Sequence, residues 1–247
     1  MNRLIRFIKH TDGKPFDRYF FGIVLMITII GLLSFVSASL GILAKSESKF
    51  YGVLFNQLVF GFVGGLLGLW ITTKINYLFW RKHAFYIFIT TLVLTLAVFI
   101  PHLGFAHGGA QRWISLGPVS FQPAELLKIG FVIYFATWLA WTQKKQQEFK
   151  YKIVPLIILL GIVAGVLLKQ PDTKSLILIA TAACGMLFVS GVSWKKVASI
   201  AIVGVLGIAL LAFVRPYVMQ RIKTYINPAH DPKGASYQLQ QSLIAIG

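Results

Sequence analysis

Charged residues and cysteine are both scarce in this chain of 247 residues. Only 13% of the residues are charged and 57% are hydrophobic, so a soluble globular protein would lack the polar residues to cover its surface. The single cysteine, Cys184, lies in an apolar run; it excludes an internal disulfide or thiolate cluster, and we interpret it as a small packing residue. The sequence also lacks a Ser-His-Asp order, a phosphate-binding glycine loop and His-rich metal spacing. These absences indicate a membrane protein without the common catalytic motifs.

Seven apolar stretches, each near the length of a bilayer crossing, fill most of the chain. They cover about 19–42, 50–72, 84–100, 123–142, 153–168, 175–191 and 197–214. Because lipid offers no hydrogen-bond partner to backbone amides, each crossing is expected to be a helix. The predicted fold class is therefore all-α, a polytopic helical membrane protein with one domain over residues 1–247.

A further apolar pattern at 236–247 starts an eighth helix but supplies only about half of the roughly 20 residues that a crossing needs. We therefore expect the chain to be truncated at its C-terminus, and expect this form to insert into the membrane but to be inactive.

Acidic residues are far fewer than basic ones, 7 against 24, and the cations are unevenly spread. Five precede Tyr19, three lie in 73–83, four in 143–152 and two at 195–196, whereas the three short loops between these segments hold five. The positive-inside rule then predicts a cytoplasmic N-terminus and places the loops 101–122 and 215–236 outside. We expect the basic charge to orient the chain and to meet anionic membrane lipids, and we expect no nucleic-acid binding.

Two charged residues stand at the start of the fourth apolar stretch. Glu125 and Lys128 are three positions apart, so on a helix they share one face and can pair where water is scarce. Removing either one would then leave a costly unpaired charge. The alternative is that Glu125 only complements the helix N-terminus after Pro123.

Three more charged residues lie in the predicted outer segments. Arg112, before Trp113, suits either a phosphate contact or anchoring at the membrane interface. Asp172, after Pro171, is predicted to cap the next helix, with a substrate contact as the alternative. Asp231 precedes Pro232 in a turn-like segment, where it is either structural or a catalytic carboxylate on a loop.

Four motifs together resemble the SEDS family, FtsW and RodA. They are Gly109-Ala-Gln-Arg-Trp-Ile-Ser-Leu-Gly117, Phe121-Gln-Pro-Ala-Glu-Leu-Leu-Lys128, Gln170-Pro-Asp172 and the segment from Asn227-Pro to Gly247. The resemblance covers essentially the whole chain and implies a ten-helix fold. Asn227-Pro and Tyr237-Gln238 are more similar to FtsW than to RodA. Two departures from the family pattern are Ala124 in place of Ser and Thr173-Lys174-Ser175 in place of Leu-Gly-Thr.

The resemblance implies a peptidoglycan glycosyltransferase that polymerises lipid II on the outer face of the cytoplasmic membrane, for division or elongation. It implies work with a class B penicillin-binding protein and other divisome or elongasome membrane proteins. Asp231 matches the essential loop aspartate and is the expected general base. The residues expected to bind or orient substrate are Arg112, Gln122, Glu125, Lys128 and Asp172.

Other interpretations of the sequence stay open. A divalent cation at the pyrophosphate is chemically reasonable, although no ligand cluster in the sequence indicates one. Intramembrane Glu and Lys also mark substrate pathways in carriers, so a precursor flippase is an alternative. A non-catalytic divisome scaffold is another, and it predicts that Asp231 can be replaced harmlessly.

Overall fold

The computed structural model describes most of the chain between residues 17 and 214: 17–43, 47–101, 103–107, 110–116, 119–144 and 149–214. Beyond residue 214 it describes only 218–219, 223–224, 226 and 242. The chain divides into two compact units, Met1–Lys82 and His83–Gly247, and helix α5 (Tyr77–Leu96) crosses the boundary between them.

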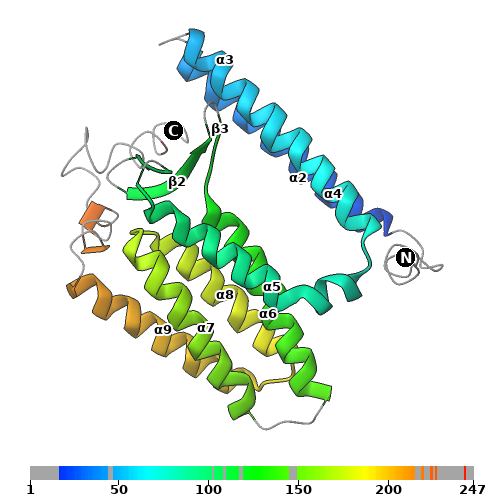
Figure 1. Cartoon of the computed structure of the whole chain (residues 1–247), viewed down its shortest axis with the longest axis vertical. Coiled ribbons are helices and arrows are strands. Elements are labelled where there is room, and N and C mark those ends of the chain that lie inside the picture. Colours follow the sequence, from blue (N-terminus) through cyan, green and yellow to red (C-terminus); the bar gives the residue numbers. More distant parts are fainter. Residues whose placement is uncertain are drawn as a thin grey trace. The chain divides into compact units, whose positions relative to one another are not determined.

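Helices make up nearly all of the described residues of the first unit (Figure 1). Helix α2 (Arg18–Leu43) starts at Asp17, whose Oδ1 accepts the backbone N–H of Phe20 at 2.9 Å and so satisfies an amide that has no partner within the helix. Helix α3 (Glu47–Asn56), the π-helix η1 (Gln57–Val63) and helix α4 (Gly64–Lys74) follow one another without a break. Asn76 then starts α5 in the same way as Asp17 starts α2, by accepting the N–H of Leu78 at 2.9 Å.

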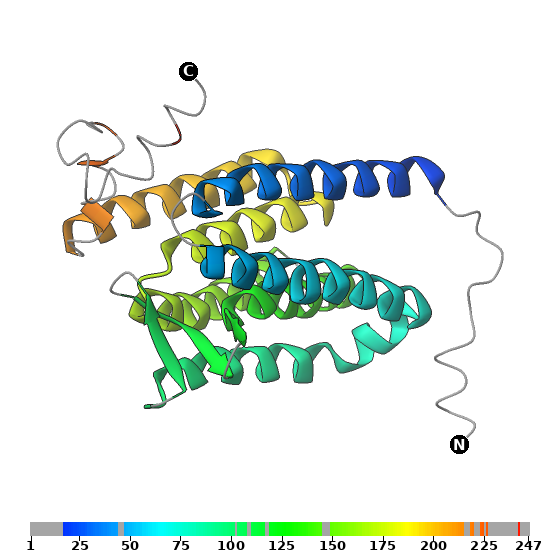
Figure 2. The same cartoon turned by 90° about the horizontal axis from the view of Figure 1, so that it is seen from above.

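The second unit packs four further helices together (Figures 1 and 2). They are α6 (Pro123–Lys144), α7 (Lys150–Lys169), α8 (Thr173–Val189) and α9 (Trp194–Val214). Helix α8 contacts α6, α7 and α9, so it lies at the centre of the group. Short connections join α7 to α8 and α8 to α9, as expected for neighbours that run in opposite directions.

The core of the second unit follows from residues spaced four or seven apart on each helix, which share one face. These buried residues are Leu127, Phe131 and Phe135 on α6, Leu156, Val163 and Leu167 on α7, and Ile179, Ala183 and Leu187 on α8. Phe88 of α5 joins this core, with its ring 6.5 Å from that of Phe131.

Two contacts between helices depend on particular residues. A Cβ added at Gly130 on α6 would lie 2.3 Å from Oγ1 of Thr91 on α5, so only glycine allows the two helices to approach this closely. Pro155 inside α7 has no N–H to give to the carbonyl of Tyr151, four residues earlier. That carbonyl instead accepts the indole N–H of Trp138 on α6 at 2.9 Å, so the freed backbone group is satisfied by the neighbouring helix.

The outward faces of the helices are apolar, which a protein in water could not sustain. Large exposed side chains include Ile157, Leu178, Phe188, Ile202 and Leu206. Five stretches of the described residues are long and apolar enough to cross a membrane: Arg18–Ser39, Phe50–Lys74, Tyr77–Phe99, Pro123–Gln143 and Lys150–Lys169. The predicted class, a helical multi-pass membrane protein, is confirmed. The number of seven crossings stays a prediction, because Thr173–Val189 is apolar but shorter.

The predicted outer loop 101–122 contains a small antiparallel sheet that the sequence analysis did not predict. Its strands, β1 (Gly104–His107), β2 (Ala110–Leu116) and β3 (Val119–Phe121), pair in chain order. Before the sheet, the short helix η2 (Ala97–Phe99) ends α5. A Cβ at Gly104 would lie 1.9 Å from the carbonyl oxygen of Val98, so the return of the chain into β1 requires glycine.

Candidate functional site

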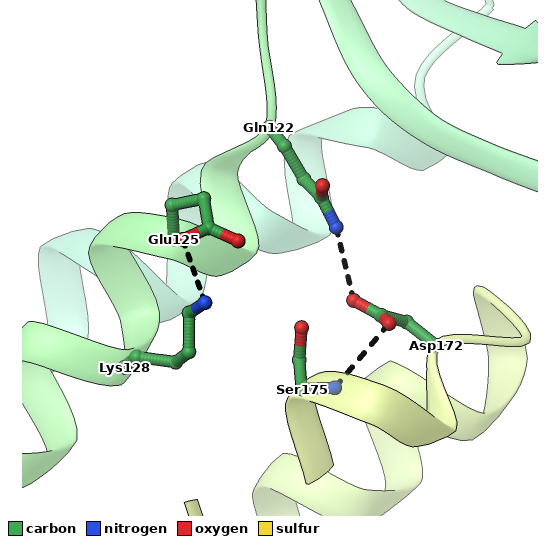
Figure 3. Close-up of polar contacts among 5 residues, drawn as sticks. All are labelled: Gln122, Glu125, Lys128, Asp172 and Ser175. Atoms are coloured by element: carbon green, nitrogen blue, oxygen red, sulfur yellow. Dashed lines mark hydrogen bonds and ion pairs between the residues drawn. The ribbon is translucent and has the colours of Figure 1, made fainter. Parts of the chain in front are cut away.

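Most of the polar residues singled out in the sequence gather at one end of the second unit. There the sheet meets the first turns of α6 and α8 and the turn between α7 and α8, residues 170–172 (Figures 1 and 3). The following contacts give this end its geometry.

Arg112 joins the sheet to the turn between α7 and α8. Its Nε donates to the carbonyl of Gln170 at 2.9 Å, and its Nη2 donates to the carbonyl of Pro171. Arg112 and Ile114 are two residues apart on β2 and point to the same face, where Ile114 is buried. A guanidinium suits this position because its rigid fork of donors can reach two carbonyls at once. Two N–H groups of Arg112, which were predicted to bind a phosphate, thus donate to backbone carbonyls of the protein itself.

Asp172 is the N-cap residue of α8, and the cap prediction is confirmed. Its Oδ1 accepts the backbone N–H of Ser175 at 3.4 Å, and its Oδ2 accepts from Nε2 of Gln122 at 3.0 Å (Figure 3). Only 2% of Asp172 is exposed, and the protein supplies a donor to each carboxylate oxygen. The bond from Gln122, the residue before α6, ties the start of α6 to the start of α8. A substrate contact by Gln122 or Asp172 stays a prediction.

Gln170 is a site residue that the sequence analysis did not select. It is 1% exposed, and its Nε2 donates to the carbonyl of Thr95 near the end of α5 at 2.7 Å. Its backbone carbonyl accepts from Arg112, while its side-chain Oε1 is buried without a hydrogen-bond partner. The signal in the sequence was a glutamine between an apolar run and a proline, where a surface residue would be the usual interpretation. Gln170 instead links α5, the sheet and the end of α7.

Glu125 and Lys128 form the predicted ion pair. Lys128 Nζ lies 2.6 Å from Glu125 Oε2 on the first turns of α6, beside the contact between Gln122 and Asp172 (Figure 3). The two partners differ in burial: the Lys128 side chain is 21% exposed and that of Glu125 is 61% exposed. The Glu125 side chain is therefore the more exposed partner, and the expectation that water is scarce around the pair stays a prediction. The pairing itself is confirmed.

An apolar pocket of 290 Å³ opens between α6 and α8 beside this pair. Lys128 is the charged residue in its lining, and the others are Ile129, Val132, Ile133, Leu178, Ile179 and Ala182. Because α6 and α8 both begin at the end that carries the sheet, Lys128 stands nearest to that end. The pocket thus has a cation at one end of a space suited to hydrocarbon.

Two predicted features of the site are not described by the structure. Asp231, the expected catalytic residue, and nearly all of the loop 215–236 lie outside the described residues. Within the part of the chain that is described, no three His, Cys, Asp or Glu side chains come together to hold a metal ion. Catalysis by Asp231 and a divalent cation at the pyrophosphate therefore remain predictions.

Comparison with known sequences gives matches to one family of proteins. The family model for FtsW, RodA and SpoVE, described as cell cycle proteins, matches residues 17–247. A probable peptidoglycan glycosyltransferase FtsW from Legionella pneumophila is 33% identical over 242 residues, covering 95% of this chain and 61% of the relative. A protein of the same description from a Geobacter strain is 32% identical over 234 residues, covering 95% and 64%. The chain thus spans a little over three fifths of the length of these curated relatives.

Two solved structures are similar in fold. One is a peptidoglycan synthase complex described for its coordination of polymerization and crosslinking, with a TM-score of 0.68 and 27% identity over 92% of this chain and 65% of that one. The other is the rod shape determining protein RodA of Thermus thermophilus, with a TM-score of 0.61 and 27% identity over 77% of this chain and 58% of that one. These structures agree with the sequence relatives on the fold.

Proposed function

Since this chain belongs to the FtsW, RodA and SpoVE family of cell cycle proteins, we propose that it is a peptidoglycan glycosyltransferase that polymerises lipid II. The reaction joins a sugar hydroxyl of one lipid II to the anomeric carbon of another, and a lipid pyrophosphate leaves. It takes place on the outer face of the cytoplasmic membrane, with a class B penicillin-binding protein as partner. The motifs favour the role of FtsW in division over that of RodA.

The observation that carries this proposal is the position of Lys128. The substrate is an amphiphile with an anionic pyrophosphate next to a long hydrocarbon chain. Lys128 lies at one end of the apolar pocket between α6 and α8, so a cation is adjacent to a space suited to hydrocarbon, as the pyrophosphate is adjacent to the hydrocarbon chain in the substrate. Positive charge near the pyrophosphate stabilises the charge that develops as it leaves. Glu125 holds the ammonium group in place at 2.6 Å, and its exposure leaves the pair accessible from outside the protein.

Arg112 and Asp172 have a positioning role in this proposal. Their donors and acceptors are engaged with Gln170, Pro171, Gln122 and Ser175, so they fix the sheet and the first turns of α6 and α8 around Lys128. The general base is Asp231, assigned from the motif it shares with the family. A general base must lie within hydrogen-bond reach of the acceptor hydroxyl from which it takes the proton.

The two alternative functions, a precursor carrier and a non-catalytic scaffold, make different demands on the charged residues. A carrier would need charged groups near the midplane on several helices, yet the ion pair found among the described residues lies on the first turns of α6. A scaffold would need neither Asp231 nor Lys128.

The test is polymerisation of purified lipid II by the full-length protein with its class B penicillin-binding protein. Asp231→Asn is expected to abolish glycan strands while leaving the thermal unfolding profile unchanged, because a loop carboxylate contributes little to packing. Lys128→Gln is expected to weaken lipid II binding, with Lys174→Gln, an exposed lysine on α8, as the matched control. Glycan synthesis at near wild-type rate by a normally folded Asp231→Asn variant would contradict the assignment. Lipid II transport into vesicles without polymerisation would favour the carrier.

A further inference from the structure

A second polar site lies at the opposite end of α7 and α8, away from the sheet. A pocket of 280 Å³ is formed by the residue before α7, the first turn of α7, the turn between α8 and α9 and the first turn of α9. Its lining residues are Phe149, Lys152, Gly191, Val192, Ser193 and Lys196. Nothing in the proposed glycosyl transfer uses them.

The backbone at the end of α8 shapes this pocket. Gly191 has a φ of 82°, which a helix commonly requires one residue beyond its last turn. Its N–H bonds to the carbonyl of Phe188 at 3.0 Å, and the N–H of Val192 bonds to that of Leu187 at 3.2 Å. These two bonds form a Schellman motif, in which Val192 folds back and is buried near Leu187. The motif leaves the carbonyl of Ser190 available to a side chain.

Two ammonium groups are positioned at the pocket by uncharged partners. Lys152 Nζ donates to the carbonyl of Ser190 at 2.8 Å, and Lys196 Nζ lies 4.5 Å from the centre of the Phe149 ring. The ammonium of Lys152 has three protons, so the bond to Ser190 leaves donors for a ligand. None of the described carboxylates, Asp17, Glu47, Glu125 and Asp172, lines the pocket. Glu148, which precedes Phe149, lies outside the described residues.

The pocket also has beside it the aromatic side chains expected at a membrane surface. Tyr151 and Trp194 flank it on the first turns of α7 and α9, and they are 44% and 65% exposed. Exposed Trp and Tyr at helix ends are typical of the depth of lipid headgroups. The lysines belong to two connections, 143–152 and 195–196, that the cation distribution assigns to the cytoplasmic side. The structure brings these two connections together at one end, as that assignment requires.

We propose that this pocket binds the phosphate of an anionic phospholipid in the cytoplasmic leaflet. Lys152 and Lys196 neutralise one phosphodiester charge from two sides, and Ser193 supplies a hydroxyl donor beside them. The same groups would recognise a free phosphate. The flanking aromatic side chains favour the lipid, because they hold the pocket where lipid phosphates are concentrated.

The test measures lipid binding to the chain purified in a neutral detergent. Phosphatidylglycerol is titrated against the protein, with phosphatidylcholine and inorganic phosphate as separate probes, and binding is followed by native mass spectrometry. Lys152→Gln and Lys196→Gln are each expected to weaken phosphatidylglycerol binding roughly five-fold, and together roughly thirty-fold. Lys152→Arg is expected to retain binding. Lys195→Gln is the control, because Lys195 is exposed and adjacent in sequence but does not line the pocket.

Several results would overturn the proposal. An equal loss in Lys195→Gln would mean that the lysines attract lipid only through diffuse charge. Binding of inorganic phosphate as tight as that of phosphatidylglycerol, with the same dependence on Lys152 and Lys196, would identify a soluble phosphate as the ligand. Binding that appears only in Glu148→Gln would mean that the chain's own carboxylate fills the pocket. Because the readout is lipid binding, its result is independent of whether the protein polymerises lipid II.

Discussion

Removing the guanidinium of Arg112 should loosen the sheet from the turn between α7 and α8. Arg112→Ala removes the donors to the carbonyls of Gln170 and Pro171 and leaves both carbonyls beside buried side chains. Arg112→Lys keeps the charge, but a single ammonium group cannot reproduce the planar fork that reaches both acceptors. The two substitutions therefore separate the geometry of the contact from its charge.

The size of the effect follows from the two hydrogen bonds. A bond with a charged donor contributes about 1.5–3 kcal/mol. Arg112 is only half-buried, so we take the lower end, which is about 3 kcal/mol for both bonds. For a chain of this size that corresponds to a decrease in Tm of roughly 6–12 °C for Arg112→Ala. Arg112→Lys should lose about half as much, because one acceptor remains bonded.

The chain carries its own reporter for this measurement. Cys184, the only cysteine, lies half-buried on α8, so a thiol-reactive dye follows the loss of packing on heating. Lys174→Ala is the control, since Lys174 is exposed near the same end of α8. If Arg112→Ala melts like the wild type and lipid II binding is lost instead, the guanidinium contacts substrate and the positioning role is wrong. Equal Tm values for Arg112→Lys and the wild type would show that charge alone suffices.

Three further substitutions test the packing and the ion pair. Trp138→Phe removes the donor to the Tyr151 carbonyl and should lower the free energy of unfolding by about 1 kcal/mol. This loss should be smaller in a Pro155→Ala background, where the new N–H satisfies that carbonyl. Equal losses in both backgrounds would contradict the account. Gly130→Ala places a Cβ 2.3 Å from Thr91 Oγ1 and should lower the free energy of unfolding by about 1–3 kcal/mol. The double variant Gly130→Ala/Thr91→Ala should recover part of this loss. An unchanged Tm in Gly130→Ala would mean that α5 and α6 are not this close. A double-mutant cycle on Glu125→Gln and Lys128→Gln should give a coupling of no more than about 1 kcal/mol in thermal unfolding, because Glu125 is 61% exposed. A coupling several times larger would mean that both charges are buried in the membrane-embedded protein.

Features that depend on neighbours in sequence were predictable. The apolar stretches predicted the helices, because an unpaired amide in lipid is too costly for any other arrangement. Asp172 was recognised as a cap because an aspartate before a helix can accept a free amide of its first turn, and Ser175 supplies that amide. The pairing of Glu125 with Lys128 followed from their spacing, since residues three apart on a helix share a face. Each of these interactions spans less than one helical turn.

Features that join distant parts of the chain required the tertiary structure. Arg112 reaches carbonyls 58 and 59 residues away, and Gln170 reaches Thr95 across 75 residues. No local pattern indicates such partners, because they depend on how the helices pack and on where the sheet lies. Helix packing also decides that Gln170 is buried and that Glu125 is exposed. It likewise brings Lys152 to the turn after α8 and Lys196 to the ring of Phe149. The types and spacings of the amino acids determined which polar and charged side chains this protein has and which of them are neighbours on one helix. Packing decided which side chains from distant parts of the chain come into contact, because those contacts depend on the whole fold.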